Sequence, residues 1–170
     1  MKKRIYLLRH AKSSWKDPLL EDFERPLNKR GKHDAPLLGK RLLSSHVLPD
    51  LIVSSPAKRA AATAKIIAKE IGYPKKQIVY ESAIYEADAA TLLALLHRLE
   101  NDVQQVLVCG HNPGLTMLAE YLGGILIENI PTCGIVCIDF AVDVWQEIGE
   151  GQGTLIFFDY PKKDERHEKE

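Results

Sequence analysis

The sequence predicts an α/β protein, a three-layer α/β/α sandwich with a mostly parallel central sheet and antiparallel strands at its C-terminal edge. Two observations lead to this prediction. Short apolar runs alternate with longer amphipathic segments over residues 4–124, which is the pattern of strands joined by crossover helices. After Gly134 only short apolar runs remain, separated by turns that contain Asp and Gly, as expected for antiparallel strands.

The first half of the chain supplies two strands and two helices. A strand is expected at residues 4–8, followed by a polar, irregular stretch over residues 13–27. A helix should run from Asn28, an N-cap residue, to Ser45, with Pro36 kinking it or delaying its start. After a strand at residues 50–54, Ser55 is expected to cap a helix that has Pro56 at its first position and ends near residue 72.

The second half continues the alternation and then changes to strands. We expect a strand at residues 77–80, a helix at 88–99, a strand at 105–109 and a helix ending near Gly123 and Gly124. Strands at residues 135–140, 144–148 and 154–160 should form an antiparallel meander at one edge of the sheet.

Length and composition favour one domain at residues 1–160, followed by a charged, fraying tail at residues 161–170. Because 23 Lys and Arg balance 23 Asp and Glu, the whole chain does not attract nucleic acid or acidic membranes. Its apolar runs are too short for a signal peptide or a membrane span. The cysteines Cys109, Cys133 and Cys137 lie in apolar stretches, as expected for core thiols in a reducing compartment. We therefore expect a cytoplasmic protein.

Polar side chains follow several of the predicted parallel strands, at the edge where α/β sheets bind ligands. Arg9 and His10 follow the first strand, Arg59 follows the second, and His111 follows the fourth. Arginine pairs with phosphate oxygens through its fork of donors. A neutral histidine can attack phosphorus and form a phosphohistidine. No Asp-rich cluster or phosphate-binding glycine loop is present, so we expect neither a metal nor another cofactor.

Three motifs resemble the histidine phosphatase superfamily, also called the phosphoglycerate-mutase-like fold. They are Leu8-Arg9-His10-Ala11 with Ser13, the segment at residues 54–60 with Thr63-Ala64, and Gly110-His111-Asn112-Pro113. Their order and context span nearly the whole chain. Together with the stretch at residues 25–31, these motifs resemble the SixA-type phosphohistidine phosphatase branch. Two departures from the wider family are Ala11 in place of glycine, which that branch shares, and Lys16 in place of an asparagine.

The resemblance implies roles for individual residues. His10 is the nucleophile, Arg9 and Arg59 clamp the phosphate, and His111 donates a hydrogen bond to it. Ser13 and Asn112 are candidates for substrate binding. Glu86 lies where family members that act on phosphoesters carry a proton donor, but it could equally contact substrate or simply be solvated.

Three functions remain open at this stage. The first is a phosphatase acting on phosphohistidine of a signalling or phosphotransfer protein, because only residues 13–27 and 80–88 could form a rim around the site. The second is a phosphatase for a small phosphoester metabolite, and the third is a non-catalytic phosphate-binding adaptor. The expected partner is thus a phosphorylated protein or a small phosphorylated substrate. The sequence does not determine an oligomeric state.

Overall fold

The computed structural model describes residues 2–162 and forms a six-stranded sheet with the strand order β3-β2-β4-β1-β5-β6. Strands β1 (Lys3–Arg9), β2 (Leu51–Ser54), β3 (Val79–Tyr80) and β4 (Gln105–Gly110) are parallel. Strands β5 (Ile135–Phe140) and β6 (Thr154–Asp159) run antiparallel at one edge. The predicted α/β class with antiparallel C-terminal strands is confirmed. The tail at residues 163–170 lies outside the described residues.

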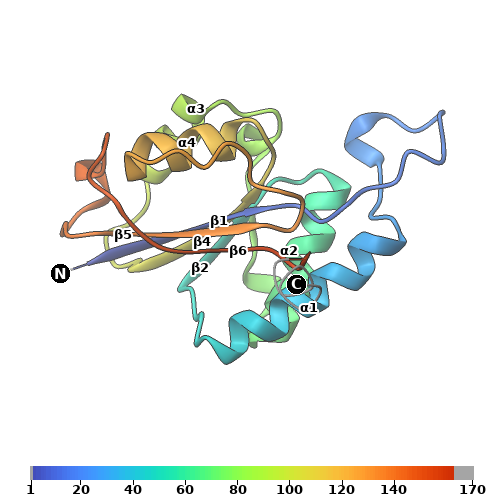
Figure 1. Ribbon diagram of the computed structural model, residues 1–170, viewed down its shortest axis with the longest axis horizontal. Coiled ribbons are helices and arrows are strands. Elements are labelled where there is room, and N and C mark those ends of the chain that lie inside the picture. The colour runs from blue at the N-terminus through green and yellow to red at the C-terminus, as the bar shows by residue number, and fades with distance from the viewer. Residues whose placement is uncertain (1, 163–170) are drawn as a thin grey trace, which may run out of the picture.

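Helices cover both faces of this sheet (Figure 1). Helices α1 (Lys29–Ser44) and α2 (Lys58–Ile71) lie on one face, and α3 (Ala89–His97) and α4 (Gly114–Gly123) lie on the other. Successive side chains of β1 point to opposite faces of the sheet, because side chains alternate along a strand. Tyr6 and Leu8 pack in the α1–α2 core, whereas Ile5 and Leu7 pack in the α3–α4 core.

Two helix starts can be compared with the sequence predictions. Asn28 caps α1 as predicted, since its side chain accepts a hydrogen bond from the Gly31 N–H. The prediction for α2 was wrong: the helix begins at Lys58, and Ala57 is its N-cap. The Ser55 hydroxyl accepts a hydrogen bond from the Ala57 N–H instead, so Pro56 precedes the helix rather than opening it.

The strand predicted at residues 144–148 is also wrong. These residues form a short 3₁₀ helix, η4 (Trp145–Glu147). Trp145 is fully buried, with its backbone N–H bonded to Asn101 Oδ1 and its ring N–H bonded to the Val103 carbonyl. Asn101 thus satisfies the backbone N–H that a strand would have placed in a ladder, and Val103 satisfies the buried ring N–H.

The segment at residues 12–28 follows β1 and projects beyond the sheet (Figure 1). It contains the short 3₁₀ helix η1 (Asp22–Glu24) and is closed by an isolated bridge between Ser13 and Leu27. At its end, Gly31 of α1 packs against the Lys12 backbone so closely that a side chain would not fit. We call residues 12–28 the β1–α1 loop.

The remaining expectations concern the cysteines and membranes. Cys109, Cys133 and Cys137 are all buried and unpaired, which confirms that they are core residues. None of the helices within residues 2–162 is long and apolar enough to cross a membrane.

Candidate active site

His10 and His111 follow neighbouring parallel strands, and the register of these strands brings their rings together. Arg9 at the end of β1 pairs with Gly110 at the end of β4. The two imidazoles therefore lie next to each other, with ring centroids 5.2 Å apart and a tilt of 53° between the planes. The structure thus places both histidines side by side at the edge of the sheet, where the sequence predicted them.

His10 has one ring nitrogen held by the backbone and one free for chemistry. Its Nδ1 lies 2.7 Å from the Ala11 carbonyl oxygen. A carbonyl can only accept, so Nδ1 carries the hydrogen, and Nε2 keeps its lone pair in the neutral ring. Burial lowers the pKa of His10 to about 3, and the charges of Arg59 and Arg9 act in the same direction. His10 is therefore neutral at pH 7.

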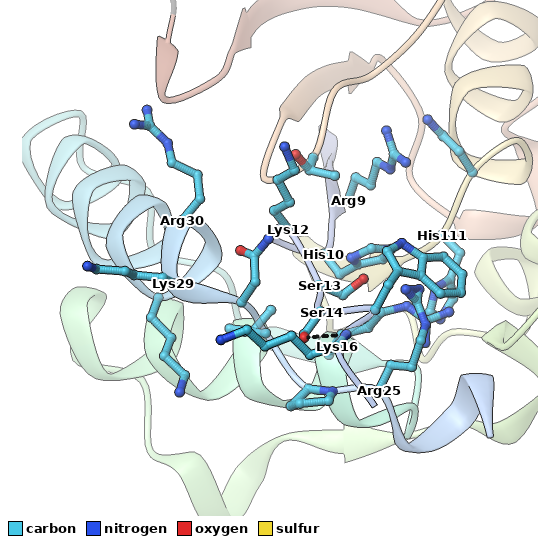
Figure 2. Close-up of a pocket in the computed structure, with 18 residues that line it drawn as sticks. Arg9, His10, Lys12, Ser13, Ser14, Lys16, Arg25, Lys29, Arg30 and His111 are labelled. Carbon is cyan, nitrogen blue, oxygen red and sulfur yellow. Dashed lines mark hydrogen bonds between the residues drawn. The ribbon is translucent and has the colours of Figure 1, made fainter. Parts of the chain in front are cut away.

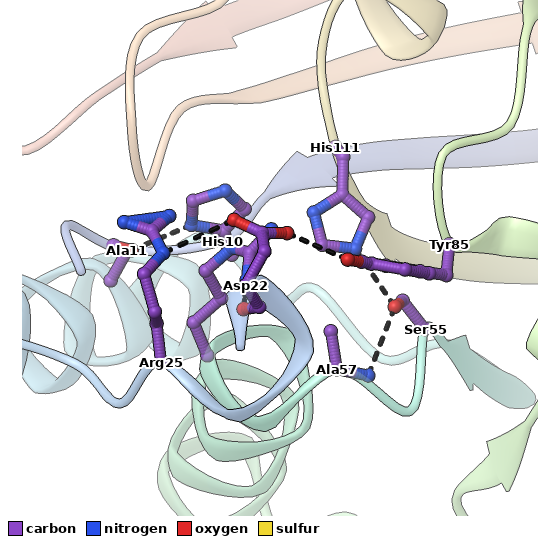
Figure 3. A network of polar contacts seen from close by, with 9 residues as sticks. His10, Ala11, Asp22, Arg25, Ser55, Ala57, Tyr85 and His111 are labelled. Carbon is purple, nitrogen blue, oxygen red and sulfur yellow. Dashed lines mark hydrogen bonds and ion pairs between the residues drawn. The ribbon is translucent and has the colours of Figure 1, made fainter. Parts of the chain in front are cut away.

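His111 is oriented by Ser55. Its Nε2 lies 2.8 Å from the Ser55 hydroxyl, and its other ring nitrogen lies on the side of His10 (Figure 3). Burial lowers the pKa of His111 to about 4, assisted by the charges of Arg59 and Arg9. When Ser55 donates to Nε2, the neutral ring carries its hydrogen on Nδ1. That N–H is a donor for an oxygen bound beside His10.

Two arginines complete the predicted set, and each retains an unused donor. Arg9 donates from Nη1 to the Ile130 carbonyl at 3.0 Å. Arg59 is 6% exposed and donates from Nη1 to the Asp22 carbonyl at 2.6 Å. The Nε atoms of both arginines are buried without a hydrogen-bond partner among residues 2–162. Because a buried N–H without an acceptor is unfavourable, these donors are suited to a ligand oxygen.

Asp22 is a site residue that sequence reasoning missed. Its carboxylate accepts hydrogen bonds from Arg59 Nη2 at 2.9 Å, Arg25 Nε at 3.1 Å and the Tyr85 hydroxyl at 2.7 Å (Figure 3). Partial burial opposes ionisation of Asp22, but the bonds from Tyr85 and Arg59 outweigh it and lower the pKa to about 2. The hydrogen bond to Asp22 raises the pKa of Tyr85 to about 12. Nothing in the sequence links these residues, because Asp22 lies in an irregular loop and Tyr85 is 63 residues away.

The other predicted site residues occupy different positions. Ser13 is half-buried and lines the cavity above His10 and the arginines. Asn112 also lines it, but its amide donates to the Ile130 carbonyl and accepts from the Thr116 hydroxyl. Glu86 is exposed, adopts a left-handed φ of 59°, and is not among the residues that line the cavity.

The cavity at this edge has a volume of about 1080 Å³ and is lined by 18 residues (Figure 2). Eight of them are cationic: Arg9, Lys12, Lys16, Arg25, Lys29, Arg30, Lys32 and Arg59. No aspartate or glutamate occurs among the described residues that line it. Within residues 2–162, no group of three His, Cys, Asp or Glu side chains is placed to hold a metal ion. The cavity can therefore bind an anion through arginine, lysine and histidine donors.

Known proteins resemble the chain in sequence and in structure. An uncharacterised chloroplastic protein of Arabidopsis thaliana is 32% identical over 85% of this chain and 70% of its own length. A Mycobacterium tuberculosis protein is 30% identical over 91% of this chain and its own full length. The structure of a SixA-type protein from Agrobacterium tumefaciens is 31% identical, with a TM-score of 0.78 over 94% of this chain and 98% of that one.

A SixA protein histidine phosphatase in complex with tungstate shares the fold. It is 22% identical, with a TM-score of 0.80 over 93% of this chain and 97% of that one. Residues 5–95, which include most of β1, all of β2 and the predicted site residues His10 and Arg59, match the first branch of the histidine phosphatase superfamily. The chain belongs to the histidine phosphatase superfamily, branch 1.

Proposed function

We propose that this protein is a metal-independent phosphatase that forms a covalent phosphohistidine on His10 and removes phosphate from phosphohistidine on a protein. One observation carries this proposal. The Nε2 lone pair of a neutral, buried His10 lies next to His111 and to two arginines that retain unpartnered donors. A nucleophile and donors for phosphate oxygens are thus already assembled.

The reaction would proceed in two displacements at phosphorus. In the first, Nε2 of His10 forms a bond to phosphorus while the bond from phosphorus to the substrate imidazole breaks and that imidazole takes up a proton from solvent. Arg9, Arg59 and His111 bind the phosphoryl oxygens; loss of one such donor typically lowers the rate about 10²- to 10³-fold. The Ala11 carbonyl, bonded to Nδ1–H, stabilises the positive charge of the phosphorylated ring. In the second step, water attacks phosphorus, the bond to Nε2 breaks, and inorganic phosphate leaves.

The chemistry of the cavity supports phosphohistidine as the bound group. An ester oxygen is a poor leaving group without an acid, whereas a protonated imidazole departs readily. Glu86, the predicted proton donor, is exposed and does not line the cavity. The 31% identity to a SixA-type protein over nearly the whole chain supports the same substrate class. Glu86 remains a prediction for the donor in a reaction with esters.

The first test is to trap labelled phosphate. A protein carrying labelled phosphohistidine is mixed with the enzyme, the reaction is stopped within milliseconds, and the label is located. We expect it on His10, and we expect His10→Ala to lower kcat by at least about 10⁴-fold because no other group replaces the nucleophile. His33→Ala is the matched control, since His33 is exposed and does not line the cavity.

Other outcomes favour the alternative functions. Label that persists in His10→Ala would exclude His10 as the acceptor. Hydrolysis of small phosphoesters without turnover of the phosphohistidine protein would indicate a metabolite phosphatase. Binding of the phosphoprotein without label transfer or turnover of either substrate would indicate an adaptor.

A further inference from the structure

The cavity contains more cations than one phosphoryl group needs. Arg9, Arg59 and the two histidines already surround the space beside the free nitrogen of His10. Its volume of about 1080 Å³ lies slightly above the range of pockets that hold whole small-molecule ligands, roughly 300–1,000 Å³. The rest of the cavity therefore has room for a part of the substrate beyond the phosphate.

Four lysines line that remaining part, which we call the lysine arm: Lys12, Lys16, Lys29 and Lys32. All four are exposed, and none has an ion pair with another residue in the range 2–162. Lys29 lies across the cavity from His111 in Figure 2. With no acidic residue among the described lining, the lysine arm is a region of uncompensated positive charge on a chain of net charge zero.

The helix dipole of α1 does not favour lysines at its N-terminal end. Lys29, Arg30 and Lys32 lie in the first turn of α1, which contains no acidic residue. Cations there oppose the helix dipole, whose N-terminal end favours negative groups. Lysines that destabilise their own helix and lack internal partners are better explained by a ligand.

A buried side chain adds a second observation in the same cavity. Arg25 is only 6% exposed, and its guanidinium stacks on the Trp15 ring with 3.3 Å between Cζ and the ring centroid. Although Nε donates to Asp22, the Nη1 atom is buried and has no hydrogen-bond partner among the described residues. Arg25 is thus a fixed cation with an unused donor, and it lines the same cavity as the exposed lysines.

We propose that the lysine arm and Arg25 bind carboxylates of an acidic protein segment that flanks the phosphohistidine of the substrate. This inference rests on the proposed function and adds the chemistry that selects the protein. The four lysines come from two separate stretches, the start of the β1–α1 loop and the first turn of α1. Compact ammonium groups on long stems suit several carboxylates spread along a segment, whereas a single fixed phosphate favours arginine forks.

The test compares two synthetic phosphohistidine peptides of equal length. One has Asp and Glu around the phosphohistidine, and the other has Asn and Gln at the same positions. We expect kcat/KM to be about tenfold higher for the acidic peptide at low salt, because complementary charges raise the association rate. Added salt should reduce this preference, since exposed charges are screened within about 8–10 Å.

Reversing the charge of two lysines tests whether the lysine arm causes the preference for the acidic peptide. The double variant Lys29→Glu and Lys32→Glu should lose the preference while its kcat for saturating phosphoramidate ion, which depends on His10 and the donors around it, stays within about twofold. Glutamates in the first turn favour α1, so a lost preference would not reflect a lost helix. The control Lys65→Glu, on an exposed residue of α2 outside the cavity, should keep the preference.

Each contrary outcome has a distinct meaning. Equal turnover of the two peptides by the unmodified protein, or equal loss of preference in Lys65→Glu, would overturn the lysine arm while leaving the proposed phosphatase intact. A small diphosphorylated ester hydrolysed faster than both peptides would assign the arm to a small polyanion and overturn the acidic segment. If neither peptide nor phosphoramidate were hydrolysed, the proposed function itself would fail.

Discussion

Ser55 connects two parts of the site that are 56 residues apart in the chain. Its hydroxyl accepts a hydrogen bond from the Ala57 N–H at 3.2 Å and lies 2.8 Å from His111 Nε2. The accepted N–H leaves the hydroxyl hydrogen available for His111, which then carries its own hydrogen on Nδ1. Ser55 is thus a positioning residue that holds the orientation of the His111 ring and, when it donates to Nε2, fixes the ring hydrogen on Nδ1.

Replacing Ser55 by alanine should lower kcat about tenfold while KM changes little. The expected loss is smaller than the 10²- to 10³-fold cost of removing a direct donor, because His111 remains at the end of β4 and only the orientation and tautomer of its ring become free. Steady-state kinetics from pH 5 to 9 would measure the loss and any altered pH profile. Ser54→Ala removes a neighbouring buried hydroxyl that donates to the Ser55 carbonyl; an equal effect of that variant would contradict the specific role of Ser55.

At the level of residues, the sequence predicted those that the sheet itself positions. Arg9, His10 and His111 follow strands, and the edge of a parallel sheet must bring such residues together. Asp22, Arg25 and Tyr85 escaped prediction because their meeting depends on the path of irregular segments, which no periodic pattern encodes. Whether the predicted residues act in catalysis as proposed is a matter for the labelling test.

The β1–α1 loop is held over the site by side chains from three segments. Asp22 of η1 binds Arg59 of α2, Arg25 of its own loop and Tyr85 near η3 (Ser82–Ile84). Tyr85 also packs edge-on against Phe23 and His111, with ring centroids 5.1 and 5.5 Å apart. The Asp22 carboxylate therefore couples the loop to the orientation of Arg59.

We expect Asp22→Asn and Tyr85→Phe each to lower the melting temperature by about 2–4 °C, the shift that roughly 1 kcal/mol produces in a domain of this size. Because both variants weaken the same hydrogen bond, one by removing the charge of its acceptor and the other by removing its donor, the double variant should lose less than the sum of the single losses. Calorimetry would measure these shifts, and faster hydrogen exchange in residues 13–27 should accompany them. Asp17→Asn, which disturbs only a bond to the Leu19 N–H in the same loop, is the control. Additive losses would contradict the coupling.

The wrong predictions for elements share a physical cause. At residues 144–148 the apolar composition suits a strand, yet partners at Asn101 and Val103 hold Trp145 in a 3₁₀ turn. Ser55 does accept a hydrogen bond from a backbone N–H, as a helix cap would. However, that N–H belongs to Ala57, which precedes α2, and the other partner of the hydroxyl is His111. Contacts between distant segments decided both cases, and such contacts are not visible in local propensity.

The site lies at the edge of the central strands, between the two hydrophobic cores that cover the two faces of the sheet. β1 and β4 are neighbours in the middle of the sheet, with helical layers on both faces. The residues just beyond them are consequently buried from both sides: His10 is 7% exposed and His111 is 9% exposed. The central position that keeps these imidazoles neutral also makes folding sensitive to their protonation.

Acidification from pH 7 to pH 5 should therefore destabilise the protein through these two histidines. Burial lowers the pKa of His10 to about 3 and that of His111 to about 4, whereas an unfolded histidine has a pKa of about 6.5. Between these values the unfolded chain binds more protons, so stability is full above pH 6.5 and falls as the pH drops toward the folded pKa values. Over this interval each histidine should remove about 1 to 2 kcal/mol from the free energy of unfolding.

Urea unfolding at several pH values would measure this loss, with the variant His10→Gln and His111→Gln as the comparison. Glutamine does not titrate, so the free energy of unfolding of the variant should change much less between pH 7 and pH 5. Asp22, with its pKa lowered to about 2, stays ionised over this range and does not contribute. An equal pH slope in both proteins would mean that His10 and His111 are accessible to protons in the folded state, and the neutral nucleophile proposed for His10 would then be limited to higher pH.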